Sequence, residues 1–161
     1  MTRDEAVELL DYDPSSGDFR WKVQSGGTIP GRIAGTAHNN GYWQIKARGI
    51  AYLAHRLAWL MVHGEWPSNE VDHINGDKRD NRIANLRTAT RSQNMANKGA
   101  NRNNTSGYKG VSLFKRTGKW VACYCKDGRT VHVGYFDTAE EAAQAHRVAY
   151  EKAFGIYARA A

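Results

Sequence analysis

The chain has only two cysteines and no long apolar segment. The first fact limits the disulfides and zinc sites that it can form, and the second excludes a membrane-spanning protein. Cys123 and Cys125 lie two positions apart, so they suggest no disulfide framework, and two cysteines exclude a four-cysteine zinc site. A mixed zinc site that adds His132 stays open as an alternative. No run of about 18 apolar residues occurs, so we expect no membrane span. Residues 1–5 lack the apolar core of a signal peptide, so we expect a cytoplasmic protein.

Acidic side chains are scarce in the last third of the chain. Residues 98–161 hold eleven basic and five acidic side chains, whereas residues 1–54 hold six of each. The formal net charge of +7 therefore comes almost entirely from the last third. Within residues 98–132, eight basic side chains stand beside a single acid, Asp127. A solvated surface is the plain interpretation of a basic stretch, but this concentration on a short β-rich segment favours a polyanion partner.

The chain does have enough apolar material for a globular protein. Its 161 residues, 41% of them apolar and five of them tryptophan, suffice for one ordinary domain or two small ones. Turn residues and apolar spacing predict the elements of the first third. These are a helix at 5–10, a turn at 13–17, a strand at 19–22, a hairpin of strands 42–47 and 50–53, and a helix at 55–63. We interpret His55, which opens the last helix, as a packing or capping residue.

Four polar residues in the middle of the chain are its most informative feature. They are Asp72, His73, Asn85 and Asn94. A histidine whose pKa lies near neutral can accept a proton from water, and Mg²⁺ prefers carboxylate and amide oxygens as ligands. These are the minimum parts for metal-assisted hydrolysis of a phosphodiester. The alternative is a polar loop in which the histidine is simply hydrogen-bonded.

Local patterns place these four side chains on a strand, a loop and a helix. The expected elements are a strand at 70–74, an exposed polar loop at 75–81 and, after a capping box of Thr90 and Gln93, a helix that begins near Arg91. Neighbours on a strand point to opposite sides, so Asp72 and His73 approach a phosphate from different directions. The amide oxygen of Asn85 can hold one imidazole N–H and leave the other nitrogen as the base. A calcium-binding loop is excluded because Asp77 and Ile83 stand where it needs glycine and glutamate.

The last third is predicted to be a separate β-rich domain. A polar stretch rich in glycine and asparagine at 99–107 is the best linker in the chain, and it separates domains at 1–98 and 108–161. The expected elements are strands at 110–114, 119–126 and 129–136, a hairpin turn at Asp127–Gly128, and a helix from the capping box of Thr138 and Glu141 to about Phe154.

Period-two alternation assigns the two faces of this three-stranded sheet. The face expected under the helix carries Trp120, Ala122, Tyr124, Val131, Val133 and Tyr135. The opposite face carries Val121, Cys123, Cys125, Thr130 and His132. The basic residues expected along the edge of that opposite face are Lys109, Lys115, Arg116, Lys119, Lys126 and Arg129.

Residues 55–98 resemble the HNH endonuclease family, in the subgroup found in phages and mobile introns. The resemblance rests on the segments HRL at 55–57, VDHING at 71–76, NRIANLR at 81–87 and TRSQN at 90–94. It implies a ββα-metal fold, with His73 as the general base and Asn85 as the residue that orients the loop of the histidine. The metal ligands that it implies are Asp72 and Asn94. Because an amide is a weaker ligand than imidazole for zinc or nickel, we expect Mg²⁺ or Mn²⁺.

Residues 107–155 resemble the AP2/ERF DNA-binding domain, which lays the exposed face of its sheet in the major groove of double-stranded DNA. The resemblance rests on the segments at 106–111, 120–122 and 134–143 and on the alanine-rich helix that follows. Plant members read bases with arginines and tryptophans, whereas the comparable positions here hold Cys123, Cys125, Thr130 and His132. We therefore expect binding mainly to phosphates. The residues expected to contact DNA are Lys109, Lys115, Arg116, Lys119, Lys126, Arg129 and His132. A protein-binding or purely structural module is the alternative.

Together these patterns predict both a fold and a function. The fold is α+β: a ββα-metal nuclease core, preceded by a small β-rich part and followed by a three-stranded antiparallel sheet with one helix. The function is a metal-dependent DNA endonuclease of a phage or mobile element, such as a homing endonuclease, without a small-molecule cofactor and active in the host cytoplasm if phage-encoded. The alternatives are a non-catalytic DNA-binding regulator with a relic motif and an RNA-directed nuclease. The target sequence, the oligomeric state and the choice between a nick and a double-strand cut do not follow from the sequence.

Overall fold

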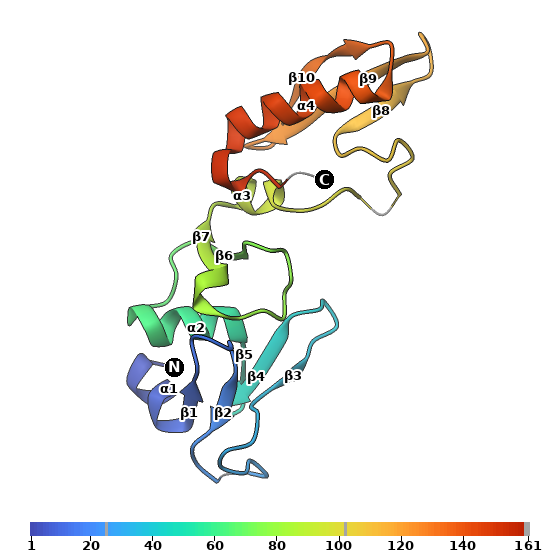
Figure 1. Ribbon diagram of the computed structural model, residues 1–161. Helices are drawn as coiled ribbons and strands as arrows, with labels where there is room; N and C mark the ends of the chain where they lie inside the picture. The colour runs from blue at the N-terminus through green and yellow to red at the C-terminus, as the bar shows by residue number, and fades with distance from the viewer. Residues whose placement is uncertain (25, 102, 160–161) are drawn as a thin grey trace. The chain divides into compact units, whose positions relative to one another are not determined.

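The computed structural model describes residues 1–24, 26–101 and 103–159. Arg102 of the predicted linker and residues 160–161 of the predicted C-terminal domain lie outside them. The structure is α+β, as expected, and divides into two compact units, residues 1–89 and 90–161 (Figure 1). No helix within the three described ranges is long and apolar enough to cross a membrane.

Among its described residues, the first unit has two helices and three small antiparallel sheets. Its elements in chain order are α1 (Arg3–Leu9), β1 (Leu10–Tyr12), β2 (Phe19–Trp21), β3 (Thr36–Ala37), β4 (Trp43–Ala47), β5 (Ile50–Leu53), α2 (Ala54–His63), β6 (Glu70–His73), a 3₁₀ turn (Ile83–Asn85) and β7 (Leu86–Ala89). Strand β1 pairs with β2, β4 lies between β3 and β5, and β6 pairs with β7. The predicted hairpin at 42–47 and 50–53 is confirmed as β4 and β5.

Local sequence signals set the ends of the two helices. The side chain of Thr2 accepts a bond from the backbone N–H of Glu5 at 3.2 Å, and the Glu5 carboxylate accepts one from the N–H of Thr2 at 2.8 Å. This capping box starts α1 at Arg3, slightly before the predicted start, and the helix ends at Leu9. Helix α2 ends at Gly64, whose φ of +86° lies in the left-handed region that favours glycine.

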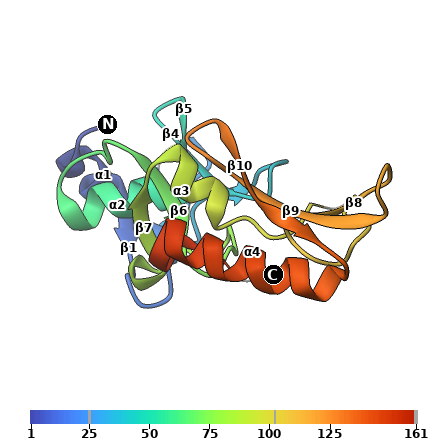
Figure 2. The ribbon, with the colours of Figure 1, turned by 90° about the horizontal axis from the view of Figure 1, so that it is seen from above.

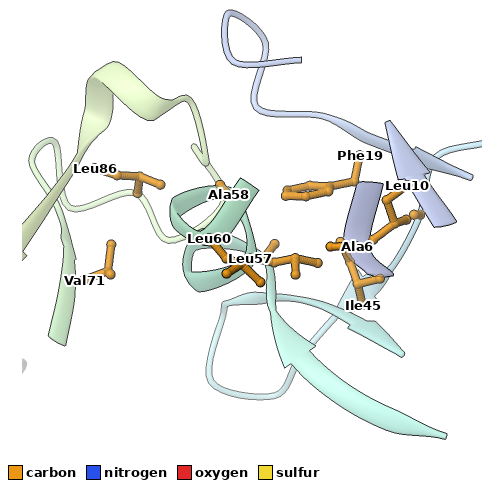
Figure 3. Close-up of a cluster of buried hydrophobic side chains, with 11 residues drawn as sticks. Ala6, Leu10, Phe19, Ile45, Leu57, Ala58, Leu60, Val71 and Leu86 are labelled. Atoms are coloured by element: carbon orange, nitrogen blue, oxygen red, sulfur yellow. The ribbon is translucent and has the colours of Figure 1, made fainter. Parts of the chain in front are cut away.

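Helix α2 is the centre of the core of the first unit. The largest fully buried side chains among the described residues are Phe19, Leu10, Ile45, Leu57 and Leu60, and all five belong to this core. Figure 3 shows Val71 and Leu86 of the β6–β7 hairpin on one side of α2, with the side chains of β1, β2 and β4 on the other. Burial of a valine or leucine side chain contributes about 1.5–3 kcal/mol. Two such side chains therefore anchor the β6–β7 hairpin to α2.

Among its described residues, the second unit has a short helix, a three-stranded antiparallel sheet and a long helix. Its elements are α3 (Arg91–Ala96), β8 (Val111–Phe114), β9 (Lys119–Lys126), β10 (Arg129–Phe136), α4 (Ala139–Phe154) and a 3₁₀ turn (Gly155–Tyr157). The strand order is β10-β9-β8, and α4 lies along one face of the sheet (Figure 1 and Figure 2). Ala122 and Ala142 are both 0% exposed, because small side chains let the sheet and α4 approach closely. The predicted sheet, helix and Thr138–Glu141 capping box are confirmed.

A bulge in β10 reverses the predicted direction of one side chain. The pairing of β10 with β9 shifts between His132 and Gly134. Beyond this point Phe136 packs under the helix, whereas Tyr135 is 54% exposed and its ring centroid lies 5.6 Å from that of Phe114. The prediction that Tyr135 faces the helix is therefore wrong, because strict alternation does not foresee the extra residue of a bulge.

Helix α3 packs within the second unit. Ala96 at its end is buried beside Tyr150 of α4, in the same cluster. The backbone carbonyl of Ala96 accepts hydrogen bonds from the Tyr150 hydroxyl at 3.0 Å and from Nζ of Lys109 at 2.8 Å. The compact units consequently divide before α3, which differs from the predicted linker at 99–107. A polar stretch marks a loop, but it does not show which unit the preceding helix packs against.

Candidate functional site

The β6–β7 hairpin turns two neighbouring side chains to opposite sides. In its antiparallel register Asp72 lies opposite Arg87, and His73 lies opposite Leu86. Nε and Nη2 of Arg87 both lie 2.9 Å from Oδ2 of Asp72. The side chain of Asp72 is only 5% exposed, so this charge-assisted pair has a fixed geometry. The hairpin therefore presents an oriented carboxylate next to the histidine of the motif.

His73 lies among three other side chains of the first unit. Its ring centroid is 4.9 Å from that of His55 and 6.0 Å from that of Tyr42, and its Nε2 is 3.3 Å from Oδ1 of Asn81. Burial lowers the pKa of His73, against the opposing effects of Asn81 and of the charge on Asp72. The imidazole is therefore neutral at neutral pH, and a neutral imidazole can accept a proton.

His55 is a second buried histidine in the same cluster. Its ring centroid lies 5.1 Å from that of Tyr42, and its side chain is as buried as that of His73. Burial, followed by the effects of His73 and Arg56, lowers the pKa of His55 to about 3. His55 was predicted to be a packing or capping residue, and its ring contacts confirm packing. Its position against the proposed base was not foreseen, because nothing local in the sequence links the two histidines.

Asn85 closes the loop that follows His73. Its Oδ1 accepts a hydrogen bond from the backbone N–H of Asn75 at 3.0 Å. Its Nδ2 donates to Oδ1 of Asn75 at 3.0 Å and to the carbonyl of Asp80 at 2.8 Å. The expectation that the amide of Asn85 holds the imidazole is wrong, because Asn81 occupies that place. Asn85 instead braces the loop, and its part in catalysis remains a prediction.

The loop from residue 75 to 82 is more tightly bonded than its polar composition predicted. Asp80 accepts hydrogen bonds from Nε of Arg82 at 2.7 Å, from its Nη2 at 2.6 Å, and from Nδ2 of Asn75 at 2.7 Å. The hydrogen bond to Arg82 is the main cause that lowers the pKa of Asp80 to about 2. Asn81 is 3% exposed, so the prediction of an exposed loop is wrong at its last residue. Hydrogen bonds replace water around this amide, and composition alone does not reveal them.

Asn94 lies in α3, whose predicted capping box is confirmed. The hydroxyl of Thr90 accepts from the N–H of Gln93 at 3.3 Å, and the Gln93 side chain accepts from the N–H of Thr90 at 2.8 Å. Asn94 is half-buried on this short helix. Asp72 belongs to the first unit and Asn94 to the second, so a metal site shared by the two remains a prediction.

Clusters of strong metal ligands do not occur in the described part of the chain. Within residues 1–24, 26–101 and 103–159, no three His, Cys, Asp or Glu side chains gather in a group that could hold a metal ion. The alternative zinc site of Cys123, Cys125 and His132 is therefore not formed, and both thiols are free of disulfides.

Two lysines predicted at the exposed sheet face have contacts inside the second unit. Nζ of Lys109 donates to the carbonyl of Ala96 at 2.8 Å and lies 4.5 Å from the ring centre of Tyr150. Burial lowers the pKa of Lys109 to about 8. Nζ of Lys126 donates to the carbonyl of Ala153 in α4 at 3.1 Å. The prediction that Lys109 lies along the edge of the exposed face is therefore wrong, because its ammonium lies against α3 and α4.

The other predicted basic residues are exposed on the sheet and its turns. The basic surface, as we name it, comprises Lys115, Arg116, Lys119, Arg129 and His132. The guanidinium of Arg116 lies 5.5 Å from the ring centre of Phe114, and Lys119 pairs with Asp137 at 3.0 Å. The exposed ring of Tyr135, which sequence reasoning placed on the other side, adjoins this surface through its contact with Phe114.

Models of two known protein families match the two regions described above. A model of the HNH endonuclease family matches residues 52–96, which run from β5 to α3. A model of the AP2 domain matches residues 106–156, which hold β8, β9, β10 and α4. No solved structure matches the chain. The two matches thus cover the predicted nuclease motif and the predicted DNA-binding sheet.

Several curated relatives match parts of the chain. An uncharacterized HNH endonuclease of Acanthamoeba polyphaga mimivirus is 36% identical over 106 residues, which are 65% of this chain and 54% of that protein, so the match spans about half the length of the relative. An AP2-like ethylene-responsive transcription factor of Arabidopsis thaliana is 40% identical over 57 residues, 35% of this chain and 12% of that protein. Protein 3.8 of Escherichia phage T7 is 30% identical over 98 residues, 60% of this chain and 81% of that protein. The chain carries an HNH endonuclease region at residues 52–96, followed by an AP2 domain at residues 106–156.

Proposed function

We propose that this chain is a metal-dependent endonuclease that hydrolyses phosphodiester bonds of double-stranded DNA, and that its C-terminal sheet binds the DNA. The observation that carries the proposal is the β6–β7 hairpin inside the HNH match. It sets a buried, neutral imidazole at His73 next to an oriented carboxylate at Asp72. Hydrolysis needs a group that accepts a proton from water and a means to stabilise the leaving oxygen. The hairpin supplies the first and contributes a ligand to the second.

His73 is the general base in this proposal. Because burial keeps its imidazole neutral, it can take the proton of a water that attacks phosphorus in line with the leaving 3′ oxygen. The wall formed by Tyr42 and His55 keeps bulk water from one side of the ring. Asn85 supports the base indirectly, because it fixes the loop that follows His73.

The oxygen ligands of the motif fit a cation that prefers oxygen. Asp72 and Asn94 would hold Mg²⁺ or Mn²⁺, which takes one or two protein oxygens and keeps waters and phosphate oxygens in its remaining positions. The pairing with Arg87 orients the Asp72 carboxylate through Oδ2. When bound, the cation would stabilise the negative charge that develops on the departing 3′ oxygen.

The basic surface of the second unit supplies affinity for DNA in this proposal. Lysine and arginine side chains bind phosphates without reading sequence. The strand positions that would reach base edges hold Cys123, Thr130 and His132 rather than arginine, so readout of guanine is weak. A tethered binding domain raises the local concentration of DNA at a nuclease that discriminates little by itself.

The direct test incubates the full chain with supercoiled plasmid and Mg²⁺ and compares His73→Ala. We expect the wild type to nick or linearise the plasmid and the variant to bind DNA with unchanged affinity but not cut it. The matched control is His38→Ala, which removes an exposed histidine of the same unit and should cut normally. Equal cleavage by His73→Ala and wild type would remove His73 as the base. Chelation of divalent cations should stop cleavage in every active sample.

The competing function is a DNA-binding regulator whose HNH motif is a relic. The observation in its favour is the Asp72–Arg87 pair, which is also what a purely structural ion pair would look like. Such a protein would bind DNA but leave plasmid intact in both Mg²⁺ and Mn²⁺. Replacing the plasmid with RNA in the same assay tests the remaining alternative, an RNA-directed nuclease.

A further inference from the structure

The amide of Asn81 determines which nitrogen of His73 carries the proton. Nδ2 of Asn81 donates to the carbonyl of Arg79 at 3.1 Å, so the other amide atom, Oδ1, faces Nε2 of His73 at 3.3 Å. An amide oxygen only accepts hydrogen bonds, so Nε2 must be the protonated nitrogen of the neutral ring. The lone pair of the imidazole then lies on Nδ1.

The segment that carries Asn81 is held by the end of β1 and by the turn between β1 and β2. The hydroxyl of Tyr12 donates to the backbone carbonyl of Asn81 at 2.8 Å, and the N–H of Ile83 donates to the carbonyl of Pro14 at 3.3 Å. Burial raises the pKa of Tyr12 to about 12, so its hydroxyl keeps the proton that it donates. Two hydrogen bonds therefore brace the backbone on either side of Arg82.

Gly17 in the same turn lets the two segments touch. Its φ is +80°, and an added Cβ would lie 2.5 Å from the backbone N of Arg82 and 2.7 Å from the backbone C of Asn81. Side chains do not tolerate such approaches, so any larger residue would displace the segment. This turn precedes residue 52, where the match to the HNH family begins, so it lies outside the matched region.

We propose that Asn81 is a positioning residue that fixes His73 in its Nε2–H tautomer and presents Nδ1 as the base, and that the β1–β2 turn holds Asn81 in place. The catalytic consequence rests on the proposed nuclease function, because the tautomer affects cleavage only if His73 takes a proton. The tautomer itself does not depend on that function. Structure and activity can therefore be tested separately.

The first test reads the tautomer of His73 directly, by two-bond ¹H–¹⁵N NMR spectra of the ¹⁵N-labelled full chain. In the wild type we expect Nε2 to show the shift of a protonated nitrogen and Nδ1 that of an unprotonated one. Asn81→Ala should move both shifts toward an average of the two tautomers. Asn81→Asp should keep the wild-type ¹⁵N shifts wherever the His73 ring is neutral, because a carboxylate, like an amide oxygen, only accepts hydrogen bonds. A residue that merely filled space would not be rescued in this way.

The second test separates chemistry from binding. Asn81→Ala should lower the single-turnover cleavage rate by about 10- to 100-fold, as loss of a supporting hydrogen bond typically does, while the DNA dissociation constant changes less than about twofold. Asn81→Asp should recover part of the rate. The control Asn69→Ala removes an exposed asparagine side chain of the same unit and should leave both quantities unchanged.

The third test addresses the turn with two matched glycines. Gly17 and Gly49 share a φ of +80°, but a Cβ on Gly49 meets no atom within 4 Å. Alanine therefore strains the backbone equally at both sites, and only Gly17→Ala displaces Asn81. Gly17→Ala should alter the His73 tautomer and slow cleavage, whereas Gly49→Ala should not. If Gly17→Ala does not fold, Tyr12→Phe with Tyr52→Phe as its control gives the same comparison.

The outcomes distinguish this inference from the proposed function. An unchanged Nε2–H tautomer in Asn81→Ala overturns the positioning role, whether or not the chain cuts DNA. A tautomer that changes in Asn81→Ala, in a wild-type chain that cuts no nucleic acid, supports the positioning role and contradicts only the proposed function. Wild-type tautomer and rate in both Gly17→Ala and Tyr12→Phe overturn the role of the turn.

Discussion

The β6–β7 hairpin and the β8–β10 sheet use polar residues in opposite ways. In the hairpin, Asp72, His73 and Asn81 are each at most 5% exposed and every one has a defined partner. On the sheet, the residues of the basic surface are exposed. Lys119 and Arg116 have partners, Asp137 and the Phe114 ring, but both contacts lie at the surface. Burial fixes the charge and direction of a few groups, which suits chemistry on one bond. Exposed charged side chains remain flexible, which suits binding to the repeating phosphates of a nucleic-acid backbone.

The two regions should differ most in the free energy of unfolding that is lost when an ion pair is broken in each of them. Arg87→Ala leaves the Asp72 carboxylate buried without its guanidinium and should lower the free energy of unfolding by about 3–5 kcal/mol. Lys119→Ala breaks an exposed pair with Asp137 and should cost less than about 1 kcal/mol. Urea denaturation followed by circular dichroism measures both. Similar losses in the two variants would contradict the contrast between a buried and an exposed region.

Acid should destabilise the first unit through its buried histidines. The pKa of His55 is lowered to about 3, and the unfolded chain binds a proton near its ordinary value of 6.5. Between these values the unfolded state binds more protons, so stability falls as the pH falls from 6.5 toward 3, by up to about 1.4 kcal/mol per unit for this group. His73 acts in the same direction. Urea midpoints at several pH values should show a shallower dependence for His55→Leu, and equal dependence would remove His55 as the source.

The salt dependence of DNA binding should separate the exposed lysine and arginine side chains from Lys109, whose ammonium has contacts inside the second unit. The triple variant Lys115→Ala, Arg116→Ala, Arg129→Ala should reduce the slope of log affinity against log salt by about 3, roughly one for each phosphate contact. Lys109→Ala should leave that slope unchanged, because its ammonium is bonded to the Ala96 carbonyl. Affinities measured between low and physiological salt test both. A reduced slope in Lys109→Ala would restore this residue to the DNA-binding set.

The smallest expected effect concerns the attachment of α3 to the second unit. Tyr150→Phe removes one hydrogen bond to the Ala96 carbonyl and should cost about 1 kcal/mol. Tyr108→Phe removes an exposed tyrosine hydrogen bond to Glu140 in the same unit and serves as the control. Protection of the α3 amides from hydrogen exchange should fall in Tyr150→Phe alone. Equal protection in both variants would mean that the Ala96 contacts do not hold the helix.

Local signals were enough to predict most elements and the motif residues. The Thr90–Gln93 and Thr138–Glu141 capping boxes start α3 and α4 at the expected places, because a cap depends only on residues within one turn. The β4–β5 hairpin followed equally from its turn residues. The family resemblances then added the expected fold and chemistry, and the family matches at 52–96 and 106–156 agree with them.

What the sequence did not reveal depends on contacts between distant residues or on irregular backbone. The partner of His73 is Asn81 rather than Asn85, and the backbone of Asn81 contacts Tyr12 and Gly17, which lie far earlier in the chain. The direction of Tyr135 depends on a bulge next to Gly134, a glycine within the strand that the alternation pattern did not take into account. The contact between His73 and Asn81 does not follow from period or propensity, because it depends on packing between segments distant in the sequence.

The most direct test of the central claim is a single-turnover plasmid assay in Mg²⁺ with wild type and His73→Ala at equal occupancy of DNA. The account predicts that the variant loses about 10²–10⁴-fold in cleavage rate, the usual contribution of a general base, with unchanged DNA affinity. Cleavage by His73→Ala at the wild-type rate would contradict it.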